Sequence, residues 1–119
     1  MYSDEEIVRL KSIDKKLDDI YSIIERHGGI VQTLNDIEGQ PAVLMLLVAI
    51  SEQFSKLYKN NSNILNHFEK IDVKGIVDVR NFIAHDYDGV NLSIVEESLR
   101  KDIPRIHKVV KSILDIFIS

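Results

Sequence analysis

Apolar residues recur every third or fourth position through long stretches of this chain, and that spacing restricts what it can fold into. The clearest stretch begins after an S-x-x-E capping box formed by Ser3 and Glu6, and it ends at Gly28 and Gly29. No segment alternates apolar and polar residues as a half-buried strand does. We therefore predict an amphipathic first helix, on the outside of a bundle or paired with a partner helix. The apolar residues on its one face are Ile7, Leu10, Ile13, Leu17, Ile20 and Ile24.

The middle of the chain predicts a buried helix. Residues 30–40 look like a connector with a short helical turn at 33–36, and Pro41 fits the first turn of the helix that follows. Residues 42–50 are apolar on all sides, which is typical of a central helix buried on most of its surface. This helix should become amphipathic at Ser51 and end near residues 60–61.

Three further segments complete the expected architecture. Residues 64–71 should form one or two helical turns, and a helix should then run from about Asp72, as N-cap, to about His85. Either Asn91 or Ser93 can cap the last helix, which Pro104 should kink or split. The sequence thus predicts an all-α protein, an antiparallel bundle of four or five helices with a kinked last helix, in a single domain over residues 1–119.

Composition excludes several classes of protein. The chain has no cysteine, so disulfides and thiolate metal sites are impossible, and its histidines show no metal-binding spacing. A net charge of −4 argues against a protein that coats nucleic acid, but not against a local site for one or two phosphates. The N-terminus is acidic and polar, and the longest apolar run is about half of a membrane span. We expect a cytoplasmic protein without membrane, metal or other cofactor.

The segment from Arg80 to Tyr87 carries the chemistry. On a helix Asn81 and His85 are four residues apart and share a face. Arg80 lies about 140° around the axis from His85, yet its long side chain can reach the same end of the helix. His85 is near the expected C-terminus, where the helix dipole favours its protonated form. Tyr87 should lie on the turn just beyond.

This set of side chains fits metal-free cleavage of RNA. The His85 imidazole can take up and return a proton, and the Arg80 guanidinium can hold a phosphate and stabilise charge. Asn81 can orient the imidazole or contact the substrate. The RNA's own 2′-hydroxyl would be the nucleophile, and two copies across a two-fold axis would form a cleft, so we expect a homodimer. The competing interpretation is an ordinary pair of surface charges or a buried polar pair.

The pattern Arg-Asn-x-x-x-His-x-Tyr, in an all-helical chain of this length, resembles the HEPN superfamily and most of all the HepT toxins of MntA–HepT systems. The resemblance covers nearly the whole chain. Residues 42–57, with Ile-Ser-Glu-Gln at 50–53, are similar to the family's central helix, where a small residue usually precedes Glu. The last helix with Pro104 is also similar. Ser51 replaces the usual Gly, and Ile76 or Val77 stands where many members have an aromatic residue.

The resemblance implies a role for each residue of the motif. Arg80 and His85 match the catalytic pair of a metal-independent endoribonuclease, and Asn81 matches the polar residue that follows the arginine. Tyr87 matches the tyrosine that a partner nucleotidyltransferase antitoxin adenylylates, and the added phosphates would repel RNA and block the cleft. The implied function is the toxin of a toxin–antitoxin module that cleaves tRNA or mRNA.

Two other functions remain open at the level of sequence. The chain could be a non-catalytic companion subunit that presents substrate to a minimal nucleotidyltransferase, in which case it would be named the antitoxin. It could also be a helical dimer with a structural role only. The Arg80–His85 pair and Tyr87 together favour the ribonuclease, whereas the net acidity slightly favours the companion subunit.

Overall fold

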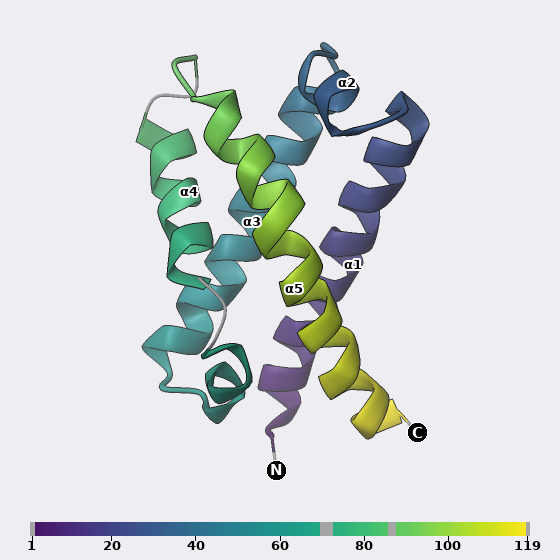
Figure 1. Cartoon of the computed structure of the whole chain (residues 1–119). Coiled ribbons are helices and arrows are strands. Elements are labelled where there is room, and N and C mark those ends of the chain that lie inside the picture. Colours follow the sequence, from purple (N-terminus) through teal and green to yellow (C-terminus); the bar gives the residue numbers. More distant parts are fainter. Residues whose placement is uncertain (1, 70–72, 86–87, 119) are drawn as a thin grey trace.

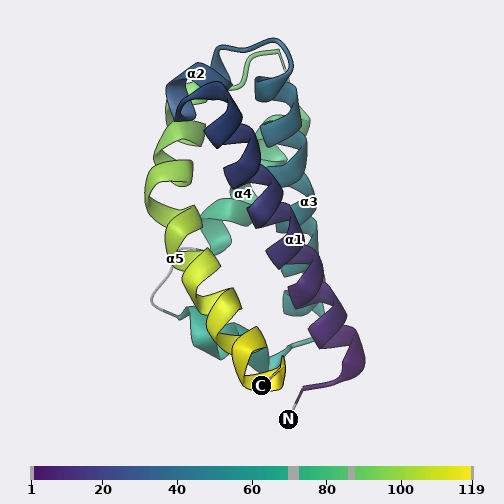
Figure 2. The ribbon, with the colours of Figure 1, turned by 90° about the vertical axis from the view of Figure 1, so that its right-hand side faces the viewer.

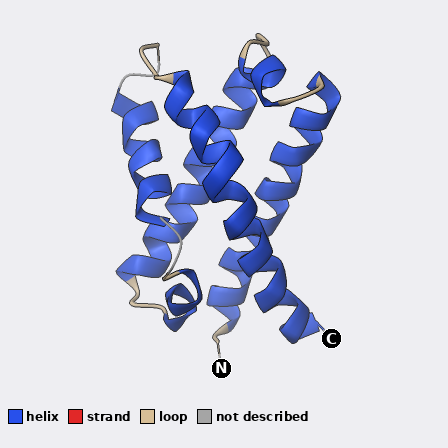
Figure 3. Cartoon of the chain, in the orientation of Figure 1, coloured by secondary structure: helices blue, strands red, loops and turns tan. Residues whose placement is uncertain are grey.

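The computed structural model describes residues 2–69, 73–85 and 88–118, and this part of the chain is helical without a strand (Figure 3). The all-α prediction is therefore confirmed. The elements are α1 (Asp4–His27), α2 (Ile30–Leu34), α3 (Gly39–Lys59), the 3-10 helix η1 (Asn63–Phe68), α4 (Val73–His85) and α5 (Leu92–Ile118).

The four long helices run up and down side by side, as expected for an antiparallel bundle (Figure 1). Helix α3 lies between α1 and α4 and contacts both, and α5 packs against the same two helices (Figure 2). The short α2 closes one end of the bundle, while η1 lies at the other end, where both termini emerge. None of the described helices is long and apolar enough to cross a membrane.

The core is built from the apolar faces that the sequence predicted. Four residues of the predicted stripe on α1 are fully buried, and α3 supplies six buried apolar residues from both halves of its length. Met45 is an exception to the expected all-round burial of residues 42–50, because it lies 58% exposed at a surface hollow between α1 and α3. The buried residues in question are Leu10, Ile13, Leu17 and Ile20 of α1 and Val43, Leu44, Leu47, Ile50, Phe54 and Leu57 of α3.

The first helix begins and ends where the sequence predicted. The capping box is present, with Ser3 Oγ accepting a hydrogen bond from the Glu6 amide at 3.1 Å and Glu6 accepting one from the Ser3 amide at 2.9 Å. At the other end Gly28 adopts φ 84°, a left-handed conformation that glycine tolerates and that stops the helix.

The connector is more helical than predicted, and the turn at 33–36 was misplaced. A separate helix, α2, occupies Ile30–Leu34, and the Asp36 carboxylate then accepts hydrogen bonds from the amides of Glu38 and Gly39 at 2.9 and 2.8 Å. These bonds lower the pKa of Asp36, the one from Gly39 most. They also let α3 begin at Gly39, so Pro41 lies in its first turn as expected.

The last helix is continuous through Pro104, so the predicted split does not occur. Its axis still changes direction along its length, as the expected kink requires (Figure 2). Asn91 is the residue that caps it, since Asn91 Oδ1 accepts a hydrogen bond from the Ser93 amide at 3.0 Å. The predicted N-cap of α4, Asp72, lies outside the described residues.

Candidate functional site

Helix α4 has a buried face and an exposed face. Its buried residues include Ile76 and Ile83, which pack into the core. His85 follows Ile76 by nine residues, which places it about half a turn away, and it is exposed at the last residue of the helix. Asp78 and Asn81 are exposed on the same outward side. The helical period thus turns the polar residues of the motif toward solvent.

A surface hollow of about 610 Å³ lies on this outward face. Arg80, Asn81 and His85 all line it, so the structure brings these three predicted site residues together. Tyr87, the fourth, falls outside the described residues. The remaining lining residues are Asp78, Phe82, Ala84 and Gly89.

The Arg80 side chain is held between the hollow and α3. Its Nη1 donates a hydrogen bond to Asn81 Oδ1 at 3.2 Å, and its Nε lies 3.8 Å from Glu52 Oε1 of α3. Both partners of this ion pair are about half exposed, so water screens it and the attraction is weak. Within the described residues, Asn81 and Glu52 face two of the five N–H donors of the guanidinium, so the other donors can bind an anion in the hollow.

Asn81 contacts the arginine rather than the histidine. Within the described residues no hydrogen bond joins Asn81 to the His85 imidazole, so the expectation that Asn81 orients this ring finds no support. Its Oδ1 instead fixes the guanidinium from one side. The other expected role, contact with the substrate, remains a prediction, as do the catalytic roles of Arg80 and His85.

Phe82 is a site residue that the sequence analysis missed. Its side chain is 48% exposed and lines the hollow. The helical period could have shown that Phe82 is exposed, because residue 82 lies about 120° around the helix axis from Ile76 and outside the buried stripe.

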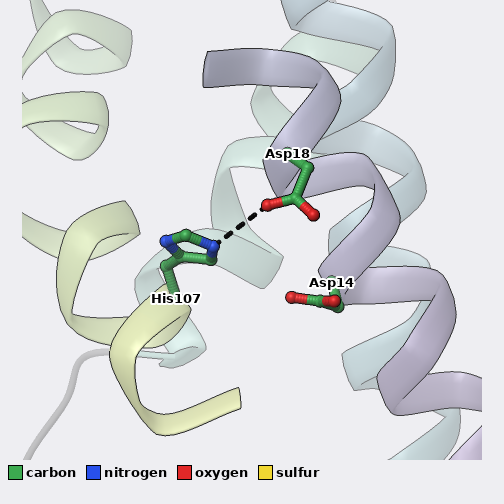
Figure 4. Close-up of side chains that lie close together, drawn as sticks. All are labelled: Asp14, Asp18 and His107. Atoms are coloured by element: carbon green, nitrogen blue, oxygen red, sulfur yellow. Dashed lines mark hydrogen bonds and ion pairs between the residues drawn. The ribbon is translucent and has the colours of Figure 1, made fainter. Parts of the chain in front are cut away.

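A second polar cluster joins α1 to α5 (Figure 4). His107 Nε2 lies 3.2 Å from Asp18 Oδ1, and the carboxylate of Asp14 is close by, so three possible metal ligands lie within 4.8 Å of one another. However, Lys111 Nζ lies 3.0 Å from Asp14 Oδ1 and 3.3 Å from Asp18 Oδ2. These carboxylates raise the pKa of Lys111, Asp14 most, so the chain supplies its own cation. We assign the cluster to the packing of the two helices.

Sequence spacing could not reveal this cluster. His107 follows Asp18 by 89 residues, and only the packing of α5 on α1 brings them together. The expectation that the histidines form no metal site was drawn from local spacing alone, which says nothing about such distant partners.

Comparison with known proteins gives two matches. The model of a family described as "Ribonuclease HepT-like" matches residues 11–113, which include the whole of α4. The chain is also similar to a protein of Caldanaerobacter subterraneus subsp. tengcongensis named "Putative RNase TTE0752", at 32% identity over 93 residues. That match covers 77% of this chain and 81% of the relative. No solved structure gives a significant match.

Proposed function

The chain belongs to the HepT-like ribonuclease family of the HEPN superfamily, and on that premise we propose that it is a metal-independent endoribonuclease, the toxin of a toxin–antitoxin module. The observation that carries the proposal is that Arg80 and His85 line one open hollow. A guanidinium and an exposed imidazole in one hollow can together cleave a phosphodiester without a metal, because one binds and stabilises the phosphate while the other moves a proton.

The proposed reaction uses a hydroxyl of the substrate as nucleophile. His85 removes the proton of a ribose 2′-hydroxyl, whose oxygen then forms a bond to the adjacent phosphorus. The bond between phosphorus and the 5′-oxygen breaks, and that oxygen takes up a proton from water. The products are a 2′,3′-cyclic phosphate and a 5′-hydroxyl, and the imidazolium of His85 returns its proton to water. Arg80 stabilises the charge on the phosphate oxygens, and Asn81 keeps the guanidinium in place by its hydrogen bond.

We also propose that two copies of the chain form the working cleft. A single hollow is open to solvent, and Phe82 exposes nearly half of its side chain beside it. Pairing two α4 faces across a two-fold axis would cover these rings and place two Arg80–His85 sets opposite each other. RNA, either tRNA or mRNA, would then bind between the protomers.

The off-switch we propose is adenylylation of Tyr87 by a partner nucleotidyltransferase. Tyr87 follows His85 by two residues, so phosphates added there would place negative charge beside Arg80 and His85 and oppose RNA binding. Incubation with the partner enzyme and ATP should raise the intact mass by one or more AMP units. A rise that persists in Tyr87→Phe would rule this residue out as the acceptor.

Cleavage of RNA by the purified protein tests the proposed function. With a chelator present the wild type should cut single-stranded RNA, while His85→Ala and Arg80→Ala should each lower the rate by about a hundredfold or more. Arg26→Ala, which removes an exposed arginine of α1, is the matched control and should cut normally. Normal cleavage by His85→Ala or Arg80→Ala would overturn the catalytic assignment. A wild type that does not cut would favour the companion-subunit alternative.

A further inference from the structure

A second groove lies next to the candidate site, where α3 and α4 pack against each other. It has a volume of about 530 Å³ and is lined by Ser55, Tyr58 and Lys59 of α3 and by Val77 and Asp78 of α4. Asp78 also lines the hollow that holds Arg80 and His85. Asp78 therefore borders both depressions, and a strand bound in one can extend across this residue into the other.

The antiparallel arrangement of the two helices sets the direction of this path. Glu52 of α3 lies next to Arg80 of α4, so these two residues are at the same height along their antiparallel helices. Lys59 follows Glu52 by seven residues, so it lies roughly 10 Å farther along α3, away from His85. A chain that leaves the candidate site along the groove meets Asp78 first and then Tyr58 and Lys59.

The lining of the groove has the chemistry of a single-stranded nucleic acid site. Tyr58 is 46% exposed, and the side chain next to it in sequence, Lys59, is an exposed cation. Exposed aromatic rings next to cations bind single strands, because any base can stack on the ring while the cation holds a backbone phosphate. Val77 adds an apolar wall on the α4 side.

We propose that this groove is a binding subsite for a nucleotide of single-stranded RNA adjacent to the cleavage site, and the proposal rests on the proposed function. Tyr58 stacks on the base and Lys59 binds a phosphate. The carboxylate of Asp78 repels phosphate, so at that point the strand presents an N–H donor of a base, such as uracil N3–H, which can donate a hydrogen bond to it. The net charge of −4 belongs to the whole chain, whereas Arg80 and Lys59 supply local positive charge at the candidate site and in the groove.

Binding of an RNA that cannot be cleaved tests the subsite separately from catalysis. The probe is a labelled, fully 2′-O-methylated oligouridine of about ten nucleotides. Tyr58→Ala should raise its dissociation constant about tenfold, whereas Tyr58→Phe, which keeps the ring, should bind as the wild type does. Lys59→Gln should lower the slope of log affinity against log salt by about 0.7, the contribution of one single-strand phosphate contact.

Two controls accompany these variants. Lys11→Gln removes an exposed lysine from α1 and should leave the salt slope unchanged, which separates a phosphate contact from a change in net charge. Circular dichroism and light scattering on every variant establish that fold and molar mass are those of the wild type. A Tyr58→Ala protein with altered molar mass would show that the groove is an interface between copies of the chain, and would overturn the proposal.

The remaining outcomes distinguish the subsite from the nuclease activity. If the wild type binds and cuts RNA but Tyr58→Ala binds the probe with the wild-type dissociation constant, the subsite proposal is wrong and the proposed function stands. If binding depends on the Tyr58 ring but no RNA is cut, the subsite stands and the nuclease proposal fails. A wild type that does not bind the probe refutes the subsite.

Discussion

Glu6 connects two parts of the chain that lie 56 residues apart. One carboxylate oxygen accepts a hydrogen bond from the Ser3 amide at 2.9 Å, and the other accepts one from the Ser62 hydroxyl, just before η1. These bonds lower the pKa of Glu6, the one from the Ser3 backbone most. The charged carboxylate therefore holds both the start of α1 and the segment that leads into η1.

Loss of this carboxylate should cost stability in a way that depends on pH. Glu6→Ala should lower the free energy of unfolding by about 1 kcal/mol near neutral pH, the usual effect of losing a helix cap. Because the folded-state pKa is depressed, this contribution is present above the ordinary value of 4.5 and is lost as the pH falls through the lowered pKa. Urea unfolding followed by circular dichroism, at neutral pH and at roughly pH 3, measures both quantities.

The matched control for this prediction is Glu6→Gln, which keeps an oxygen acceptor but cannot titrate. It should lose less stability than the alanine variant, and the part of the stability that Glu6 titration contributes should be absent from its pH profile. A difference between wild type and Glu6→Ala that is as large in acid as at neutral pH would show that the carboxylate charge is not what stabilises these bonds.

At the scale of single residues, sequence predicted the contacts that are local. The bond between Ser3 and Glu6 follows from an S-x-x-E pattern within one turn of helix, so a single sequence is enough to find it. The bond from Ser62 to Glu6 and the ion pair between Arg80 and Glu52 join different elements. Such contacts depend on how helices pack, which periodicity does not specify.

At the scale of elements, the long helices were predicted better than the short helix between α1 and α3. The apolar stripes of α1 and α4 follow from a period of 3.6 residues, which also places Asn81 and His85 on one outward face. Helix α2, at Ile30–Leu34, was misplaced as a turn at 33–36 because five residues are too few to show a period. It is held instead by tertiary contacts, with Leu34 buried and the Thr33 hydroxyl donating to the Gly29 carbonyl at 2.7 Å.

The continuity of α5 shows how packing overrides a local rule. Pro104 removes one backbone hydrogen bond and usually breaks a helix. Here Ile103 and Ile106 on either side of it are fully buried in the core, as is Val110 one turn later. The apolar face that holds α5 against the bundle continues past the proline, so the helix bends rather than ends.

At the scale of the whole molecule, the four long helices bury their apolar faces against one another but leave the outward side of α4 uncovered. This side carries Arg80, Asn81 and His85, and Phe82 lies among them with 48% of its surface exposed. Covering this aromatic ring would be favourable, because burial removes apolar surface from water. The proposed second protomer would do so, and that gives a prediction for the assembly.

Phe82→Ser should weaken the dimer without adding a charge beside His85. Two Phe82 rings, each with about half of its surface left to bury, contribute about 2 kcal/mol together, so the dissociation constant of the dimer should rise roughly thirtyfold. Sedimentation over a range of protein concentrations measures it, and RNA cleavage should fall in parallel because the cleft needs both copies.

Ile37→Ser, at an apolar residue that is 88% exposed near α2, is the matched control and should change neither the dissociation constant nor the rate of cleavage. If Phe82→Ser stays dimeric at the wild-type dissociation constant, the α4 face is not the interface, and a fully active monomer would show that one Arg80–His85 set is enough.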